Sequence, residues 1–293
     1  IKRVVASHPR VRTIYLTDDD FCIVKKGVIQ FCEKIIDEKE TGGIPKNLTF
    51  MAFCRASDAN EEIFKWMKKA NFRRLNIGIE SFSNKVLEEM NKRCTVEENH
   101  HCLKISKEIG VGAYCNIIVT TPESTLEDVE ATVNGAYHYT QDPFYHLGVT
   151  LGIKPLKGTD YYETFSDFRT RVVEIENSNY HLKYDDLIYA NDPRVKTLQI
   201  RYWNEIDDFI TEEREKKDIK HGNSRNLSAL KLIFLKKLIE DIKNKKLSVM
   251  ANNDKNLDKE DPYNERQTVD IDVDVEYKAD KKKSKKSRYG SWA

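Results

Sequence analysis

The stretch that decides the fold is a short apolar run that ends in polar residues and leads into a helical pattern: LNIGIESFSNKVLEEM, residues 75–90. Its first five residues, Leu75 to Ile79, have the apolar character of a buried strand. Similar runs rich in Val, Ile, Leu and Phe recur through the first 162 residues. Five strands are therefore expected, at residues 13–16, 48–53, 75–79, 113–119 and 146–153.

Helices are expected between these strands. Three pairs of residues have the spacing of a capping box. In this motif the first side chain accepts a hydrogen bond from a free backbone N–H of the helix, and an acid three residues later accepts one from the backbone N–H of the first residue. The pairs are Asp58 with Glu61, Thr95 with Glu98, and Thr125 with Asp128. Asn71 and Gly110 mark helix ends. Because neighbouring parallel strands need a crossover helix, this alternation predicts an α/β fold with a parallel sheet, either open or closed into a barrel.

Composition limits the classes of function. The chain has 293 residues, 39% of them hydrophobic, which is enough for one sizeable core. Its 49 basic and 48 acidic residues leave a net charge of +1, so bulk charge gives no nucleic-acid signal and indicates no membrane partner. No apolar run is long enough for a membrane span. The six cysteines form no CxxC pair and no dense framework, which favours a reduced, cytoplasmic setting.

Three regions differ in character. Residues 1–162 hold the strand and helix alternation, residues 163–249 mix aromatic and charged residues with long helical patterns, and residues 250–293 form a charged tail that we expect to be disordered. The first residue is Ile1, and no leader sequence follows it. We interpret the chain as one that begins partway into a larger protein.

Polar residues follow all five expected strands. In both open and closed parallel sheets the ligand site lies at the carboxyl ends of the strands, so these segments are the candidate site. Ordinary loop chemistry, with acids that cap helices and Gly and Pro in turns, is the alternative for each segment taken alone. The segments are residues 17–21, 54–58, 78–82, 120–125 and 154–159.

Four of these segments share their order and spacing with a known family. Residues 78–93 contain a GIES…VL…MNK block, and residues 116–128 follow it with a strand and a PEST…ED turn. Residues 155–161 and the DDDF turn at residues 18–21 complete the set. Together they resemble the radical S-adenosylmethionine (SAM) superfamily, and most of all the subgroup that often carries an N-terminal cobalamin-binding domain.

The resemblance implies a partial (β/α)6, TIM-like barrel that lacks its first strand and continues into a helical C-terminal region. It also implies SAM and a [4Fe–4S] cluster as cofactors, and cobalamin as a further candidate. Such an enzyme cleaves SAM reductively and starts radical chemistry on a substrate, here an unidentified small molecule or peptide. An electron donor such as flavodoxin or ferredoxin would be its partner.

The resemblance also assigns SAM-binding residues, each with a structural alternative. Glu80 and Ser81 would hydrogen-bond the ribose or the methionyl portion, although Glu80 could instead cap the next helix. Lys92, beside Arg93, would pair with the methionyl carboxylate, although a cation after a short helix also suits the helix dipole. Asn116 would lie near the ribose, or bond to a neighbouring loop.

Two weaker candidates complete the expected SAM site. Arg55, after the second expected strand, would face the same cavity. The acids from Asp18 to Asp20 lie where the family often contacts the SAM amino group. Catalytic residues stay unassigned.

The CxxxCxxC motif that binds the cluster in this superfamily is missing. Three thiolates must converge on such a cluster, and the closest cysteines here, Cys94 and Cys102, are eight positions apart. Cys22 and Cys54 fall near strand ends and could lie near each other. We therefore expect no metal ligands in this chain and a cluster loop upstream of Ile1. The alternative is a degenerate barrel without a cluster that acts as a binding or scaffold protein.

The turn after the fourth expected strand also departs from the family pattern. Thr120 and Glu123 replace its usual glycines. Contact between this backbone and SAM is therefore in question.

Overall fold

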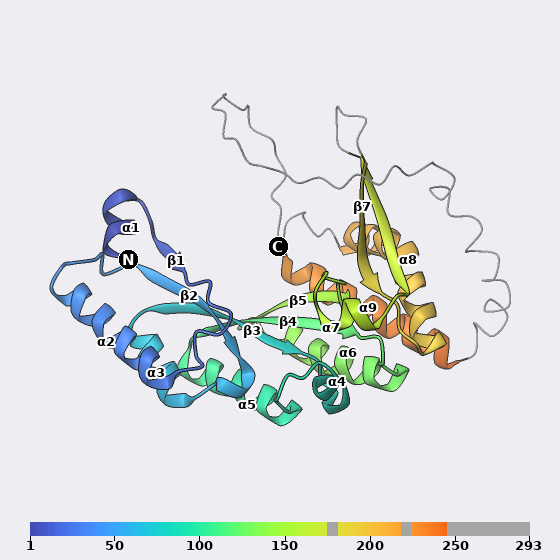
Figure 1. The fold of residues 1–293 in the computed structure, drawn as a ribbon, viewed down its shortest axis with the longest axis horizontal. Coiled ribbons are helices and arrows are strands. Elements are labelled where there is room, and N and C mark those ends of the chain that lie inside the picture. Colours follow the sequence, from blue (N-terminus) through green and yellow to red (C-terminus); the bar gives the residue numbers. More distant parts are fainter. Residues whose placement is uncertain (175–180, 218–223, 245–293) are drawn as a thin grey trace. The chain divides into compact units, whose positions relative to one another are not determined.

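A computed structural model of the protein describes residues 1–174, 181–217 and 224–244 (Figure 1). All of them fall within one compact unit, Ile1–Asp254. The charged tail expected at residues 250–293 lies outside the described residues. Among the described helices, none combines the length and the apolar character that crossing a membrane requires.

A five-stranded parallel sheet forms the centre of the fold. Its strands follow chain order, and each overlaps a range expected from the sequence, which confirms the α/β, partial TIM-like barrel. The strands are β1 (Thr13–Tyr15), β2 (Thr49–Arg55), β3 (Phe72–Glu80), β4 (Gly112–Thr120) and β5 (Tyr145–Gly152).

Helices cover one face of this sheet. Figure 1 shows α2, α3, α5 and α6 along it, and the burial of β3 agrees, because Leu75, Ile77 and Ile79 have no exposed surface while the alternate residues are half-buried. We call the other side the open face. The helices of this part are α1 (Lys2–Ser7), α2 (Lys25–Glu40), α3 (Glu61–Lys69), α4 (Asn84–Glu89), α5 (Val96–Ile109) and α6 (Leu126–Thr140).

Two of the three expected capping boxes are present. Thr95 with Glu98 and Thr125 with Asp128 each make both of the required hydrogen bonds. The third was placed wrongly at Asp58, because residues 56–58 form a short 3-10 helix and the chain is extended again before α3. Asn60 caps α3 instead, where its side chain accepts hydrogen bonds from the backbone N–H groups of Glu62 and Ile63.

The expected helix ends are confirmed by backbone geometry. Gly110 lies directly after α5 with φ of 80°, and Asn71 lies just after α3 with φ of 74°. Both angles are in the left-handed region, which glycine adopts freely and asparagine tolerates better than most residues. These residues therefore turn the chain from helix into the next strand.

The region after residue 162 contains an antiparallel hairpin as well as helices. Only helices were expected at residues 163–249. Charged residues hide the strand pattern, and some of them pair across the hairpin, as Arg169 does with Asp186 at 2.9 Å. The elements are α7 (Asp160–Thr164), β6 (Phe168–Glu174), β7 (His181–Ile188), α8 (Pro193–Lys217) and α9 (Ser224–Lys243).

Helix α9 covers the outer edge of β5. The Ser228 hydroxyl donates a hydrogen bond of 2.6 Å to the carbonyl oxygen of Leu147, and Lys231 Nζ donates one of 3.2 Å to that of Val149. These two carbonyls face away from β4 and would need another strand to satisfy them. Side chains of α9 thus take the place of a sixth strand at this edge.

Candidate functional site

The candidate site lies on the open face, where β3, β4 and β5 end. Asn116 of β4 is in register with Gly78 on one side and Gly148 on the other. A Cβ at Gly78 would lie 2.7 Å from Glu80 Oε1, and a Cβ at Gly148 would lie 2.5 Å from the Tyr114 hydroxyl. The two glycines therefore leave room for polar side chains to lie over the sheet on either side of Asn116.

Glu80 and Lys92 form an ion pair at this position. Lys92 Nζ lies 2.8 Å from Glu80 Oε1, and the two side chains are only 25% and 12% exposed. Glu80 has φ of 59°, and the two neighbours of Lys92, Asn91 and Arg93, have φ of 51° and 52°. Since non-glycine residues rarely adopt this conformation, the backbone is strained on both sides of the pair. The strained backbone holds the Glu80 carboxylate and the Lys92 ammonium next to each other.

Ser81 faces the opposite way from Glu80. Its side chain is fully buried, and its oxygen is 2.6 Å from the Thr132 hydroxyl of α6. It also accepts a hydrogen bond from the backbone N–H of Ser83. These contacts fix the end of β3 against α6, on the helix-covered side of the sheet.

Asp18 and Arg55 are the most exposed of the sequence-predicted residues. No hydrogen bond or ion pair joins Asp18 to another residue in the described part of the chain. Arg55 keeps 52% of its side chain exposed, with Nε 3.9 Å from an oxygen of Asp20. Among the acids of this loop, Asp20 has a side chain whose position is fixed by hydrogen bonds. Its Oδ1 accepts hydrogen bonds from the backbone N–H groups of Cys22 and Arg55.

The open face also carries polar residues that the sequence analysis missed. Asn76 Nδ2 donates a hydrogen bond of 2.5 Å to the Tyr15 hydroxyl, whereas Asn76 Oδ1 is buried without a partner. Arg74 stacks over the Tyr114 ring at 5.2 Å, and its buried Nε also lacks a hydrogen bond. Unpaired polar atoms of this kind fit a surface that receives a polar ligand. The sequence does contain a signal for these residues. In β3, buried apolar residues alternate with polar residues or glycine, namely Arg74, Asn76, Gly78 and Glu80.

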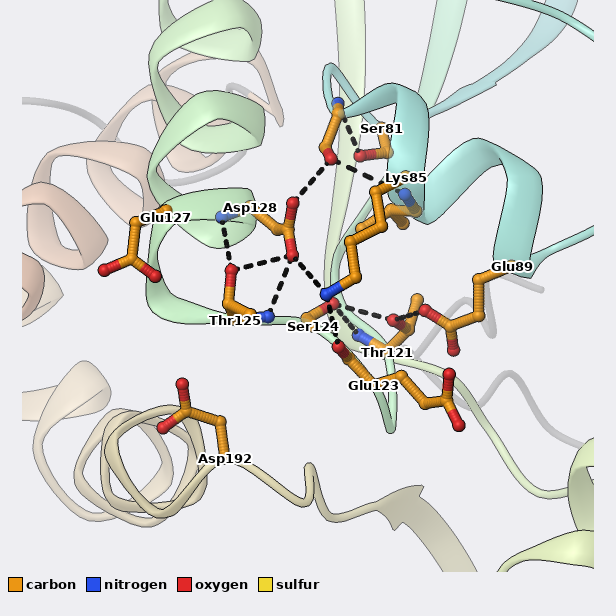
Figure 2. Close-up of polar contacts among 12 residues, drawn as sticks. Ser81, Lys85, Glu89, Thr121, Glu123, Ser124, Thr125, Glu127, Asp128 and Asp192 are labelled. Carbon is orange, nitrogen blue, oxygen red and sulfur yellow. Dashed lines mark hydrogen bonds and ion pairs between the residues drawn. The ribbon is translucent and has the colours of Figure 1, made fainter.

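The turn between β4 and α6 holds a dense set of hydrogen bonds, shown in Figure 2. Asp128 accepts hydrogen bonds from Ser83, Thr125 and Lys85 at 2.7 to 3.2 Å. Burial alone would raise the pKa of Asp128, but these hydrogen bonds outweigh it and lower the pKa below its usual value. We call this set the turn network; it consists of Ser83, Lys85, Thr121, Ser124, Thr125 and Asp128.

Of the two residues that depart from the expected turn, Thr120 is the one whose side chain has structural partners. The Thr120 hydroxyl donates to the Leu151 carbonyl at 2.8 Å and accepts from Gln199 Nε2 at 2.8 Å. Glu123 contributes only its backbone carbonyl oxygen, which accepts a hydrogen bond from Lys85 Nζ. Thr120 therefore anchors α8 to the end of β4.

The cysteines of this chain do not converge as an iron–sulfur cluster requires. All six are free thiols, five of them buried. Cys22 and Cys54 approach each other, as expected, but the third member of their group is Asp20 rather than another cysteine. Residues of this chain therefore do not fit a [4Fe–4S] cluster held by three thiolates.

Comparisons with known proteins agree with the geometry. Residues 1–135 match the model of the radical SAM superfamily. An uncharacterized methyltransferase of Pyrococcus horikoshii is 31% identical over 126 residues, which cover 43% of this chain and 26% of that protein. An anaerobic magnesium-protoporphyrin IX monomethyl ester cyclase of Cereibacter sphaeroides is 27% identical over 144 residues, 48% of this chain and 23% of the cyclase.

A solved structure shares the fold over a longer stretch. The cobalamin-dependent SAM radical enzyme OxsB, in its apo form, superposes with a TM-score of 0.56 at 13% identity. The match covers 82% of this chain and 40% of that one. This chain thus spans about a quarter of the length of the two curated relatives and less than half of OxsB.

Proposed function

We propose that this chain belongs to the radical SAM superfamily, whose model residues 1–135 match, and that it forms the SAM-facing part of an enzyme that cleaves SAM reductively to start radical chemistry. The observation that carries the proposal is the Glu80–Lys92 ion pair above Gly78 on the open face. The proposal assigns the cluster ligands to residues outside this chain, because its cysteines do not converge on one point.

The ion pair suits the amino-acid end of SAM, which carries an ammonium and a carboxylate. Glu80 can accept hydrogen bonds from the ammonium, and Lys92 can donate to the carboxylate, so a bound zwitterion exchanges one ion pair for two. The pair is partly shielded from water, which strengthens both contacts. Bound SAM supplies the 5′-deoxyadenosyl group, while these side chains only bind and orient it.

Asn116 is assigned to the ribose. It projects from β4 between two glycines, and its amide can both donate to and accept from the two ribose hydroxyls. Arg55 and Asp18 stay as outer contacts, because both are exposed at the mouth of the same strand ends. Ser81 is left out, since its hydroxyl is already engaged by Thr132 on the other side of the sheet.

Partners and setting follow from the same proposal. The full-length enzyme takes an electron from a donor such as flavodoxin or ferredoxin and acts on a small molecule or a peptide. Cobalamin is included as a candidate cofactor, to be tested by the absorbance spectrum of the purified full-length protein. A cytoplasmic setting is proposed because all six cysteines are free thiols. No observation favours the alternative of a scaffold without a cluster.

SAM binding tests the assigned residues. Loss of a hydrogen bond to a charged group costs about 1.5–3 kcal/mol, so Lys92→Met is expected to weaken SAM binding by about ten- to a hundredfold in isothermal titration. Lys65→Met is the matched control, since Lys65 forms an ion pair with Glu61 on the exposed side of α3. Unchanged affinity in Lys92→Met would place the methionyl group elsewhere.

SAM cleavage tests the reaction itself. The full-length protein, reconstituted anaerobically with iron and sulfide and reduced, should form 5′-deoxyadenosine from SAM. Asn116→Ala should lower the rate of formation, and Lys65→Met should leave it unchanged. A reconstituted protein that binds SAM and forms no 5′-deoxyadenosine would contradict the reductive cleavage and support the scaffold alternative.

A further inference from the structure

A second polar cluster lies where β1 and β2 end, on the helix-covered side of the sheet and beside Arg55. Cys54 is the last buried residue of β2, and the loop after β1 brings Asp20 and Cys22 beside it. The two thiols are 3% and 2% exposed. The ligand atoms of all three residues lie within 4.8 Å of one another. We call these residues the thiol–carboxylate cluster.

Asp20 leaves one of its oxygens unsatisfied in this cluster. The side chain is only 8% exposed, and its Oδ2 is buried without a hydrogen-bond partner. Arg55 Nε lies 3.9 Å from that oxygen, which is too far for a hydrogen bond, and its side chain is half exposed. A buried carboxylate oxygen without a hydrogen-bond donor is costly, and the distant, half-exposed Arg55 leaves room for a closer cation.

A second acid lies next to this cluster in the chain. Asp58 ends the short helix of residues 56–58 that directly follows β2, four residues after Cys54. It is therefore the candidate for a fourth ligand.

The distances suit a small tetrahedral ion. Zn–S bonds are about 2.3 Å and Zn–O bonds about 2.0–2.2 Å, so ligand atoms around zinc lie about 3.4–3.8 Å apart. The cluster atoms are separated by at most 4.8 Å, and a contraction of about 1 Å brings them to that geometry. Thiolates select zinc over magnesium and calcium, which prefer oxygen ligands alone.

We propose that Asp20, Cys22 and Cys54 bind one Zn²⁺ ion, with Asp58 or a water molecule as the fourth ligand. Binding releases the protons of the two thiols and gives Asp20 Oδ2 its missing partner. The ion ties the loop after β1 to the end of β2, and its role is structural. This site is separate from the [4Fe–4S] cluster and does not depend on SAM cleavage.

The test is a zinc titration of the reduced full-length protein after metal removal, followed by competition with a chromogenic chelator. No iron or sulfide is added, so the result does not require SAM cleavage. The cysteines of the proposed cluster loop can also bind zinc, so the Zn²⁺ ion of the thiol–carboxylate cluster is the one whose binding depends on the residues changed below. Cys22→Ala, Cys54→Ala and Asp20→Asn should each weaken that binding at least tenfold. Cys115→Ala is the matched control, because Cys115 is equally buried, at 1% exposure, in the middle of β4.

Cobalt provides a second, spectroscopic readout. Co²⁺ added to the wild-type protein should give thiolate-to-cobalt charge-transfer bands. Part of this absorbance should be lost in Asp20→Asn, where both thiols remain, and more of it in Cys22→Ala and Cys54→Ala. The proposal is wrong if the wild type gives no such bands, or if Cys115→Ala weakens zinc as much as Cys54→Ala. Formation of a disulfide between Cys22 and Cys54 under the reducing conditions would also overturn it.

Discussion

The turn network and the thiol–carboxylate cluster both lie at the carboxyl ends of the strands, and they differ in how completely their polar atoms are paired. Both oxygens of Asp128 accept hydrogen bonds, from two hydroxyls and an ammonium. Asp20 accepts hydrogen bonds through one oxygen, whereas the other is buried without a hydrogen bond and has only Arg55 Nε at 3.9 Å. The difference teaches how to separate scaffold from site: a saturated buried acid holds the fold, and an unsaturated one is prepared for a ligand.

The most direct way to break this comparison is to remove the saturated acid. Asp128→Ala leaves Ser83, Lys85 and Thr125 without their shared acceptor and should lower the free energy of unfolding by about 2–4 kcal/mol. Urea unfolding measures the loss. Glu127→Ala in the same helical turn is the control, because Glu127 is 63% exposed and pairs with Arg194 at the surface, where such pairs contribute about 0–1 kcal/mol. Equal effects of the two variants would contradict the distinction.

Metal binding at the thiol–carboxylate cluster should raise the free energy of unfolding. At a free Zn²⁺ concentration of 100 times its Kd, binding should stabilise the reduced protein by about 2.7 kcal/mol. Thermal unfolding with and without zinc measures this gain. Cys54→Ala should show none, and Cys115→Ala should show the full gain. A zinc effect that survives in Cys54→Ala would mean that the metal binds elsewhere.

Acid should weaken the turn network in a predictable direction. The pKa of Asp128 is lowered in the folded protein, so its stabilisation is fully present above the unfolded pKa of about 3.9 and is lost as the pH falls through the folded pKa. Asp128→Asn should therefore be less stable than the wild type at pH 7, by on the order of 1 kcal/mol, and the gap should close on acidification. Unfolding curves between pH 7 and strongly acidic pH measure the gap, and a constant gap would contradict the assignment.

The smallest effect on stability is expected at the Glu80–Lys92 pair. Glu80 and Lys92 already pair with each other, as the residues of the turn network do, but the proposed function assigns them to SAM binding. Lys92→Met should change the free energy of unfolding by no more than about 1 kcal/mol, because the pair lies at a partly open surface. Urea unfolding beside the SAM titration separates the two roles. A large loss of stability with unchanged SAM affinity would move Lys92 into the scaffold.

Local signals account for the parts of the fold that were predicted well. The strands were visible because β2 to β5 are buried runs of apolar residues, and the capping boxes at Thr95 and Thr125 act within four residues of chain. Asp58 misled because its carboxylate belongs to a short 3-10 turn, and the cap moved two residues on to Asn60. The β6–β7 hairpin was missed because charged residues interrupt its apolar pattern, as Arg169 and Asp186 do where they pair across the two strands.

Contacts between distant residues account for what the sequence could not provide. Glu80 and Lys92 were assigned from the family block, but the sequence does not show that Glu80 and Arg93 adopt a positive φ beside the ion pair. Ser81 follows Glu80 directly and yet bonds to Thr132, fifty-one residues later in the chain. Asp18 was chosen from three consecutive acids, whereas packing of the loop against β2 selects Asp20. The motif identifies the segment, and only the packed structure identifies the atom.

The contacts of α9 with β5 also bear on how molecules of this protein behave toward one another. Ser228 and Lys231 occupy the carbonyls of Leu147 and Val149, which are the acceptors that a strand from a second molecule would use. A chain shortened before α9 would leave these β5 carbonyls without hydrogen-bond donors. An exposed strand edge of this kind promotes pairing between the sheets of two molecules. Ser228 and Lys231 thus protect this edge of the sheet from pairing with a strand of another molecule.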